Sequence, residues 1–466
     1  MAIEMNGEHA FVRAPNRTLL NMSVPVLFSL VAEPITGLAD TAFVARLGAE
    51  AVAALGIGAM AFSAVFWAFN FLGIGTQTEV AHYIGGGQRG RAAEMGALAV
   101  FLATALGIGL MICISPILRP IAALLGGDGT VLGLAEDYML YRLMGAPAVL
   151  VTIACFGSLR GAQDMTTPFW VASGVNLLNV LLDWLLIFGH GPIPPLGVAG
   201  AAIASTAAQW MGAFWVLLVL SRKVGFSFRV NLTDMKKLFS IGGDLFIRSG
   251  MVLLFLSLCT RVANQAGAAE GAAYQAIRQF FIFAALFMDA FAITGQSLVG
   301  YFLGRRDVHN ARRVAIYTCW WSIVTGVVLC AAMITGVEWV ALLLVPADAR
   351  SSFDGAWVTL SFILPFFSLA CATDGIHWGT GDFKYLRNVM LVACLSAAPL
   401  VLLFEAMHLD DILVWIWLGT GIWAGIRSGF GVVRIIPGIG RAPLKKTPRR
   451  RKRKAPLLEK GRFSFH

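Results

Sequence analysis

The chain has 466 residues, of which 58% are hydrophobic and only 13% are charged, and its mean hydropathy is +0.75. A soluble protein of this size carries roughly twice that charged fraction, so composition excludes an ordinary soluble enzyme and indicates a polytopic membrane protein. The net charge of +10 is concentrated in KKTPRRRKRK at 445–454. The seven cysteines form no CxxC pair, so neither a disulfide framework nor a zinc site is expected. No signal peptide is evident.

Apolar segments long enough to cross a bilayer recur along the whole chain. A spanning helix needs about 20 apolar residues. Twelve segments meet this length, and the predicted fold class is therefore an all-α polytopic membrane protein with twelve transmembrane helices. They lie near 17–46, 51–84, 93–118, 131–157, 166–190, 196–221, 238–264, 271–303, 311–336, 350–378, 385–407 and 411–436.

The loops between these segments differ in charge. One set, which includes both termini, is rich in lysine and arginine, and the alternate set has few basic residues. The positive-inside rule places both termini in the cytoplasm, which requires an even number of spans. The longest connection, 222–237, is basic and divides the chain into an N-lobe (1–221) and a C-lobe (238–436), followed by a basic cytoplasmic tail (437–466).

An internal repeat supports two six-helix lobes. TQTEVAHYIGGGQRGRAAE at 76–94 aligns with GQSLVGYFLGRRDVHNARR at 295–313 at an offset of 219 residues, and GAQD at 161–164 aligns with GTGD at 379–382 at an offset of 218. Six helices per half leave both repeats in the same orientation. The lobes are then related by a pseudo-two-fold axis along the membrane normal, with substrate between them, as in secondary transporters.

Two carboxylates lie inside apolar helices of the N-lobe, where a charge is costly. Asp40 and Asp183 are each predicted at a similar depth in the outer half of the membrane, and Asn176, Asn179 and Asp183 share one helical face. With Tyr138 these groups form a candidate proton-coupling site. The same oxygen set could hold Na⁺, and a satisfied structural network is the remaining alternative. Under the repeat, Asp40 and Asp183 have no acidic counterparts in the C-lobe.

The first span also contains two prolines and a second acid. Pro25 and Pro34 remove helical hydrogen bonds and are candidate hinges, although a static kink explains them equally. Glu33 lies on roughly the same face as Asp40. It is either part of the ion site or a group that faces water.

Charged residues of the C-lobe spans form a second candidate polar or substrate site, which comprises Arg248, Asp289 and Asp374. An interhelical arginine–carboxylate pair accounts most simply for Arg248 and Asp289, because isolated charges at that depth are unfavourable. Direct contact with substrate is the alternative.

No motif indicates an enzyme or an ATP-driven pump. The glycines at 85–87 lack the GK[ST] ending of a nucleotide loop, and no cofactor is expected. Coupling must then come from an ion gradient. The basic segment at 445–454 is expected to bind anionic lipid rather than nucleic acid.

The segment PVLFSLVAEPITGLADTAFVARLGAEAVAALGIG resembles the opening of multidrug and toxic compound extrusion (MATE) transporters, and within them the DinF-like branch. The resemblance continues through IGGGQRGRAAE, LRGAQDMTTP, NLLNVLLDWLLIFG and TDGIHWGTGD and covers about 16–436. It implies two lobes around a cleft and export of amphipathic, often cationic compounds in exchange for H⁺ or Na⁺. It further implies functional positions at Pro25, Asp40, Tyr138, Asn179, Asp183, Arg248, Asp289 and Asp374.

The predicted function is a proton-coupled multidrug antiporter of the inner membrane, monomeric and exporting drug-like compounds. The seventh span lacks an acid like the glutamate of the Na⁺-linked NorM-like branch, which favours H⁺ over Na⁺. A lipid-linked flippase of the same superfamily would need a cationic hydrophilic cavity, and the acidic N-lobe argues against it. A membrane enzyme and a channel or receptor are disfavoured by the lack of a catalytic set and by the two-half repeat.

Overall fold

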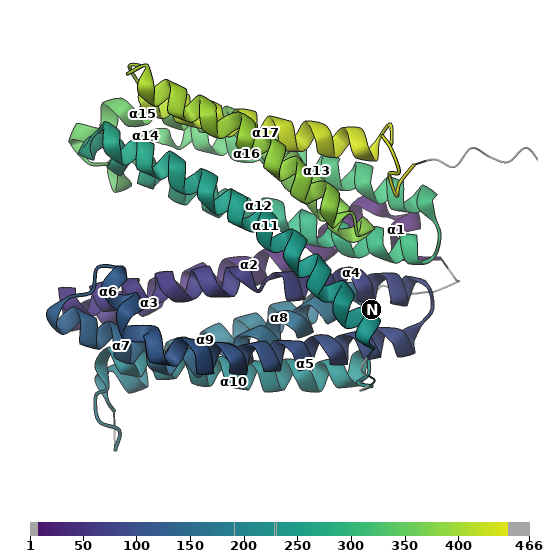
Figure 1. Ribbon diagram of the computed structural model, residues 1–466, viewed down its shortest axis with the longest axis horizontal. Helices are drawn as coiled ribbons and strands as arrows, with labels where there is room; N and C mark the ends of the chain where they lie inside the picture. Colours follow the sequence, from purple (N-terminus) through teal and green to yellow (C-terminus); the bar gives the residue numbers. More distant parts are fainter. Residues whose placement is uncertain (1–7, 191, 228, 230, 446–466) are drawn as a thin grey trace, which may run out of the picture.

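The computed structural model describes residues 8–190, 192–227, 229 and 231–445, all helical or in connections (Figure 1). Most of the predicted basic tail, including 446–454, lies outside the described residues. The helices of the first half are α1 (Ala10–Arg13), α2 (Pro15–Val44), α3 (Ala49–Ala68), α4 (Phe71–Gly85), α5 (Arg89–Ile114), α6 (Leu118–Leu124), α7 (Gly129–Leu143), α8 (Ala146–Gly161), α9 (Thr166–Phe188) and α10 (Gly197–Lys223). Those of the second half are α11 (Leu232–Ala266), α12 (Ala268–Gly304), α13 (Val308–Thr335), α14 (Val337–Leu344), α15 (Arg350–Thr380), α16 (Phe383–Ala406) and α17 (Ile412–Ile435).

The long helices account for the predicted spans. Within the described ranges, ten helical stretches are long and apolar enough to cross a membrane, and α7 with α8, bent by 47°, makes an eleventh. The 24-residue α17 packs along α15 and α16 and completes twelve. Its length of ~36 Å suffices for a crossing. The connection between α10 and α11 begins after Lys223 and ends before Leu232, so the 222–237 interval includes the first turns of α11.

Two spans are interrupted where the sequence predicted continuous helices. The predicted second span breaks into α3 and α4 around Phe69 and Asn70. The fourth bends between α7 and α8, where Pro147 occupies the first turn of α8 and has no N–H to continue the helix. By contrast, α2 runs without a break through both Pro25 and Pro34.

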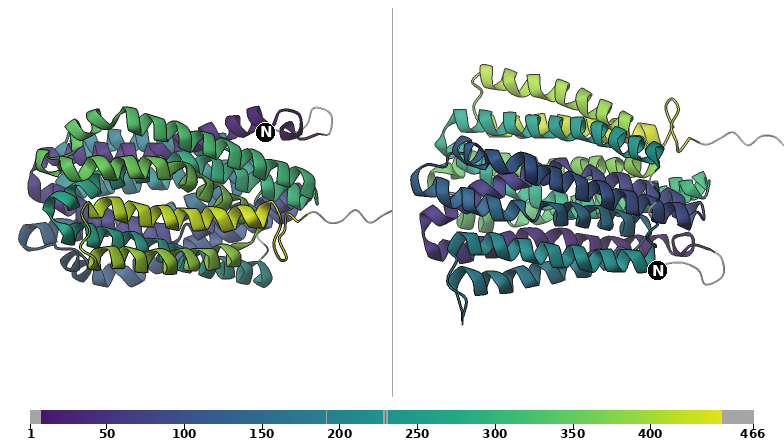
Figure 2. Two further views of the ribbon diagram at one scale, coloured as in Figure 1. Left: turned by 90° about the horizontal axis from the view of Figure 1, so that it is seen from above. Right: turned by 60° about the horizontal axis from the view of Figure 1, so that its bottom comes forward.

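The helices form two bundles, drawn in purple to blue and in teal to yellow (Figure 1). Each bundle has its own apolar core. The C-lobe core is built around Trp357, Trp417 and Trp423, and the N-lobe has two clusters, one that includes residues of α4, α5 and α8 and one that includes residues of α3 and α7. Both ends of the described chain lie at one end of the molecule, and the long helices run roughly parallel to the longest axis (Figure 2). The all-α fold with two lobes is therefore as predicted.

The two lobes meet through a pair of equivalent backbone contacts that the internal repeat relates to each other. A Cβ on Gly85 would lie 1.9 Å from the Tyr301 carbonyl oxygen, and a Cβ on Gly304 would lie 2.1 Å from the His82 carbonyl oxygen. These pairs differ by the same 219 positions as the sequence repeat. Only glycine permits this backbone approach, which explains why both turns contain it.

The N-terminal segment crosses from one lobe to the other at this same end. His9 donates from Nε2 to Gln163 Oε1 of the N-lobe at 2.8 Å, and its ring packs on Tyr301 of the C-lobe. Phe11 is fully buried against Phe302 and Tyr317. Inter-lobe packing is therefore concentrated near the chain ends, and the two bundles diverge toward the opposite end (Figure 1).

Candidate functional site

The structure brings the two N-lobe acids together. Asp40 lies four residues before the end of α2 at Val44, and Asp183 is fully buried on α9. Their carboxyl groups lie within hydrogen-bonding reach of each other. Asn179 donates from Nδ2 to Asp183 Oδ2 at 3.2 Å and to Ser205 Oγ at 3.3 Å. Oδ1 of each aspartate is buried without a hydrogen-bond partner among the described residues.

Tyr138 completes this group, together with an arginine that sequence reasoning missed. Tyr138 is 4% exposed, and the Arg142 guanidinium lies close enough to interact electrostatically with its hydroxyl group and with both carboxyl groups. Arg142 lies one helical turn after Tyr138 on α7, so the i, i+4 spacing could have identified it. The predicted fourth span, 131–157, contains Arg142, but no role was assigned to it from the sequence. We call Asp40, Tyr138, Arg142, Asn179 and Asp183 the N-lobe cluster.

The other predicted N-lobe residues lie around this cluster rather than in it. Asn176 is half-buried one turn before Asn179, and Glu33 and Pro34 are exposed on α2. Neither Asn176 nor Glu33 has a hydrogen bond to the cluster among the contacts of the described chain. Pro25 is half-buried nearer the start of α2.

The C-lobe charges pair differently from the prediction. Asp374 on α15 accepts hydrogen bonds through Oδ2 from Arg248 of α11 and from Arg427 of α17, the latter at 2.6 Å. The predicted pair of Arg248 with Asp289 is therefore wrong. Asp289 of α12 lies near these groups but makes no ion pair or hydrogen bond to them in the described structure. The orientation of α15 about its own axis explains this pairing, because it places Asp374 between α11 and α17.

A cavity of about 250 Å³ lies between the lobes and includes the C-lobe charges. Its N-lobe wall comes from the break between α3 and α4, with Trp67, Asn70 and Phe71. Its C-lobe wall carries polar and aromatic side chains, among them Arg248, Asp289, Asp374, Arg427, Phe281, Phe367, Trp378 and Trp423. We call this space the central cavity.

The two polar groups lie at different depths along the molecule. Asp40 is close to the end of α2 that lies away from the chain termini, whereas Asp374 lies six residues before the terminal-side end of α15. The positions related to Asp40 and Asp183 by the repeat are Cys259 and Val401, both fully buried in the apolar C-lobe core. The lobes therefore share a backbone plan but have different polar interiors.

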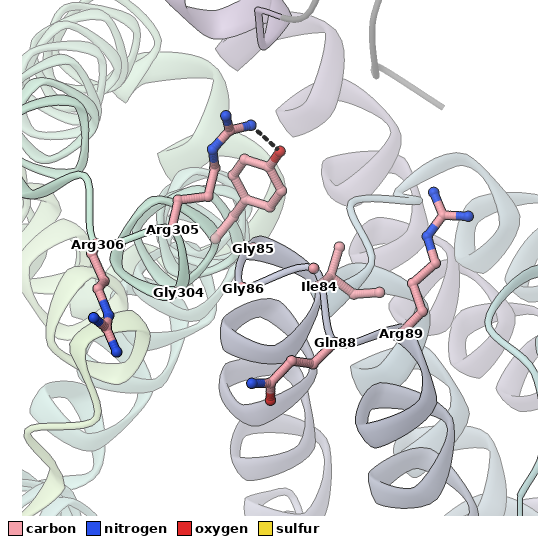
Figure 3. Close-up of a pocket in the computed structure, with 10 residues that line it drawn as sticks. Ile84, Gly85, Gly86, Gln88, Arg89, Gly304, Arg305 and Arg306 are labelled. Carbon is pink, nitrogen blue, oxygen red and sulfur yellow. Dashed lines mark hydrogen bonds between the residues drawn. The ribbon is translucent and has the colours of Figure 1, made fainter.

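A second cavity, of about 650 Å³, lies at the terminal end between the repeated turns at 84–89 and 301–306 (Figure 3). It contains three arginines, but their guanidinium groups point in different directions, and that of Arg305 bonds to the Tyr301 hydroxyl group. Within the described ranges no group of three or more histidine, cysteine, aspartate or glutamate side chains could hold a metal ion.

A two-lobed bundle of membrane-spanning helices with buried carboxyl groups in one lobe and a cavity between the lobes is typical of a secondary membrane transporter. The MatE family model matches the chain twice, over residues 25–185 and 245–403. The chain belongs to this family, the MATE transporters, which are multidrug efflux proteins and not enzymes. The two matches fall in the two halves that the repeat relates.

Curated relatives and solved structures agree with this assignment. The chain is 26% identical over 464 residues to the chloroplastic protein DETOXIFICATION 45 of Arabidopsis thaliana, covering 93% of this chain and 81% of the relative. It is 27% identical to the DNA damage-inducible protein F of Escherichia coli, covering 90% and 92%, in line with a DinF-like MATE transporter. A crystal structure of a MATE in the bent conformation superposes with a TM-score of 0.83 at 20% identity, over 91% of this chain and 96% of that one.

Proposed function

We propose that this MATE transporter exports amphipathic compounds in exchange for protons by alternating access. The observation that carries the proposal is the direct approach of the Asp40 and Asp183 carboxyl groups inside the N-lobe. Two ionised carboxylates in contact repel each other strongly away from water. A proton held between them would satisfy the two oxygens that otherwise have no partner.

Arg142 supports a single exchangeable proton at this cluster. With one proton on the carboxyl pair, the guanidinium balances the remaining negative charge. Loss of that proton leaves the cluster with a net charge of −1, which disfavours a closed and dry N-lobe. The two states of the cluster therefore favour different conformations, and coupling requires only such a difference.

The inter-lobe contact supports alternating access. The lobes pack at the end that carries both termini, and we propose that this end faces the cytoplasm of the cell that makes the protein, with the protein in its inner membrane. The conformation is then closed inside and open outside, and transport requires the glycine contacts at Gly85 and Gly304 to separate. Pro25 and Pro34 of α2 are the proposed positions at which this helix bends.

We propose a domain organisation that follows the division of the chain into two lobes. The N-lobe comprises 1–221 and the C-lobe 238–436, joined by a cytoplasmic linker within 222–237 and followed by a tail at 437–466 that binds anionic lipid. The cargo is expected to be aromatic, because rings from both lobes line the central cavity. The acidic N-lobe cluster favours a cationic cargo, whereas the central cavity carries two arginines as well as two acids.

Two alternatives differ in measurable ways. The oxygens of Asp40, Asp183 and Asn179 could hold Na⁺ instead of a proton, and transport would then follow a Na⁺ gradient. A lipid-linked flippase would move lipid-linked substrates and show little drug efflux. The acids of the N-lobe cluster favour the antiporter over the flippase.

The proposal is tested with purified protein in liposomes that contain a trapped pH-sensitive dye. An imposed pH gradient should drive uptake of ethidium, with proton movement that depends on ethidium, and an equal Na⁺ gradient should not. Asp40→Asn should abolish the coupled proton movement, and Asp137→Asn, which alters an exposed neighbour of the cluster on α7, should not. Full uptake against a gradient by Asp40→Asn, or uptake driven by Na⁺ alone, would overturn proton coupling.

A further inference from the structure

The C-lobe wall of the central cavity contains buried hydrogen-bond donors that have no acceptor among the described residues. Arg427 is 5% exposed, and its Nε and Nη1 have no partner among the described residues. Arg248, 9% exposed, has an unpartnered Nε, and Trp378 has an unpartnered Nε1. All three residues line the central cavity. Buried N–H groups without an acceptor are energetically unfavourable, so a set of four needs an explanation.

The neighbouring carboxylates do not use these donors. Asp374 engages both arginines through the single atom Oδ2, and each guanidinium contributes only one nitrogen, Nη2. Asp289 makes no hydrogen bond to either arginine in the described structure. The two carboxylates and two guanidinium groups balance in charge, but their geometry leaves these four N–H groups without acceptors.

The aromatic rings give the same wall a flat, apolar surface. The Arg427 guanidinium lies over the Trp423 ring at 4.2 Å from its centroid, and that of Arg248 lies over the Trp378 ring at 5.4 Å. Trp67 and Phe71 face this wall from the N-lobe side of the cavity. A planar ring can stack between these surfaces while an attached oxygen group meets the guanidinium edges.

We propose that the central cavity binds a planar aromatic ligand bearing a carboxylate or similar anionic oxygen group, which accepts hydrogen bonds from Arg427, Arg248 and Trp378. The proposal specifies the chemical class of the ligand. It rests on the proposed function only in that it treats this ligand as the transported compound. A cationic aromatic compound would have to use Asp289 and would leave the unpartnered donors unsatisfied. The donor set therefore favours an anion over the cation that the N-lobe acids suggest.

The test is equilibrium binding to the detergent-solubilised full chain, measured by isothermal titration calorimetry without any ion gradient. The probes are 2-naphthoate, its neutral analogue 2-naphthylmethanol and the cation 2-naphthylmethylammonium. We expect 2-naphthoate to bind about tenfold more tightly than the neutral compound, since hydrogen bonds to a charged acceptor are stronger than those to a neutral one. The ammonium compound should bind most weakly.

Variants connect this preference to the cavity. Arg427→Met should remove the preference for 2-naphthoate, and Trp378→Phe, which keeps a ring but loses the N–H group, should weaken it. Arg261→Met alters a half-exposed arginine farther along α11 that pairs with Glu405 outside the cavity, and it should leave the preference unchanged. Asp289→Asn removes a negative charge that has no ion-pair partner in the described structure, so it should tighten 2-naphthoate binding and weaken ammonium binding.

Tighter binding of the ammonium compound than of 2-naphthoate would overturn the proposal. So would equal 2-naphthoate affinity in the wild type and in folded Trp378→Phe and Arg427→Met proteins. If Arg427→Met does not fold, the opposite responses of the two charged probes to Asp289→Asn still decide the matter. Because no gradient is involved, the result is independent of whether protons drive transport.

Discussion

Gln77 and Gln296 make equivalent hydrogen bonds in opposite directions across the inter-lobe contact. Gln77 Nε2 donates to the Ile293 carbonyl oxygen at 2.8 Å, and Gln296 Nε2 donates to the Ile74 carbonyl oxygen at 2.8 Å. Both the donors and the acceptors are 219 positions apart. The pseudo-two-fold symmetry that relates the lobes therefore extends to individual side chains at the surface where the lobes must part.

Removal of these hydrogen bonds should loosen the closed end of the molecule. Gln77→Leu or Gln296→Leu should each shift the closed state by about 1 kcal/mol toward opening, because a buried carbonyl loses its donor. Amide hydrogen exchange should become faster at 84–89 and 301–306 in both variants. Gln275→Leu, on the same helix as Gln296 but without an inter-lobe hydrogen bond in the described structure, is the control, and unchanged exchange in both variants would show that the two bonds do not hold the lobes together.

Asp40 and Asp183 should act as one unit in proton exchange. We expect Asp183→Asn, like Asp40→Asn, to abolish substrate-dependent proton movement in liposomes. The double variant should be no more impaired than either single variant, because a proton shared by two carboxyl groups is lost when either is replaced. Independent and additive losses would mean that the two acids carry separate protons.

Glycine contacts within the C-lobe should be required for stability. A Cβ on Gly375 of α15 would lie 2.2 Å from the Ala292 carbonyl oxygen of α12, whereas a Cβ on Gly250 would meet nothing within 4 Å. Gly375→Ala should destabilise the protein by about 1–3 kcal/mol through overpacking. Gly250→Ala should be neutral or stabilising by about 0.5–1 kcal/mol, since alanine favours helix.

Thermal unfolding in detergent compares these two glycine variants directly. The expected result is a lower melting temperature for Gly375→Ala than for Gly250→Ala. Equal melting temperatures would indicate that α12 and α15 can separate locally without loss of stability.

Asp164, in the connection between α8 and α9, should contribute stability that depends on pH. Its carboxylate accepts hydrogen bonds from Lys223 Nζ at 2.7 Å and from the Thr167 hydroxyl group at 2.6 Å, and these contacts hold its pKa below the usual value of 3.8 although burial opposes them. A lowered pKa means that the contribution is fully present above the unfolded pKa of about 3.9 and is lost as pH falls through the folded value.

Asp164→Asn should therefore lower the melting temperature at pH 7, and the difference from the wild type should shrink below about pH 4. The effect should be at most about 1 kcal/mol, because Lys223 is half-exposed and solvent screens the pair. Asp348→Asn, at an exposed turn, is the matched control. A difference that stays constant between pH 3 and pH 7 would exclude this ionisation as its cause.

The positions of the spans followed from the sequence because a membrane imposes a simple length and hydropathy requirement on each helix. All twelve predicted segments correspond to helices. The break at Asn70 was missed because apolar composition continues through it, and hydropathy carries no information about a local turn. The repeat could be seen in the sequence because the close inter-lobe contacts require a glycine in each half, Gly85 in the first and Gly304 in the second.

The placement of Asp40 near Asp183 also followed from the sequence, because depth can be counted along a helix of known direction. Arg142 and Arg427 were missed as site residues, and Arg248 was assigned the wrong partner. These errors have one physical origin. Counting residues gives the depth of a side chain in the membrane, but not which neighbouring helix its face is turned toward.

The sequence by itself therefore determined the membrane class, the two related halves and the depth of the buried charges, since these depend on composition and spacing along each helix. Only the tertiary structure decided which charges meet. The rotation and packing of each helix about its axis placed Asp374 between Arg248 and Arg427, left Asp289 without an ion-pair partner in the described structure, and brought Arg142 to the Asp40–Asp183 pair.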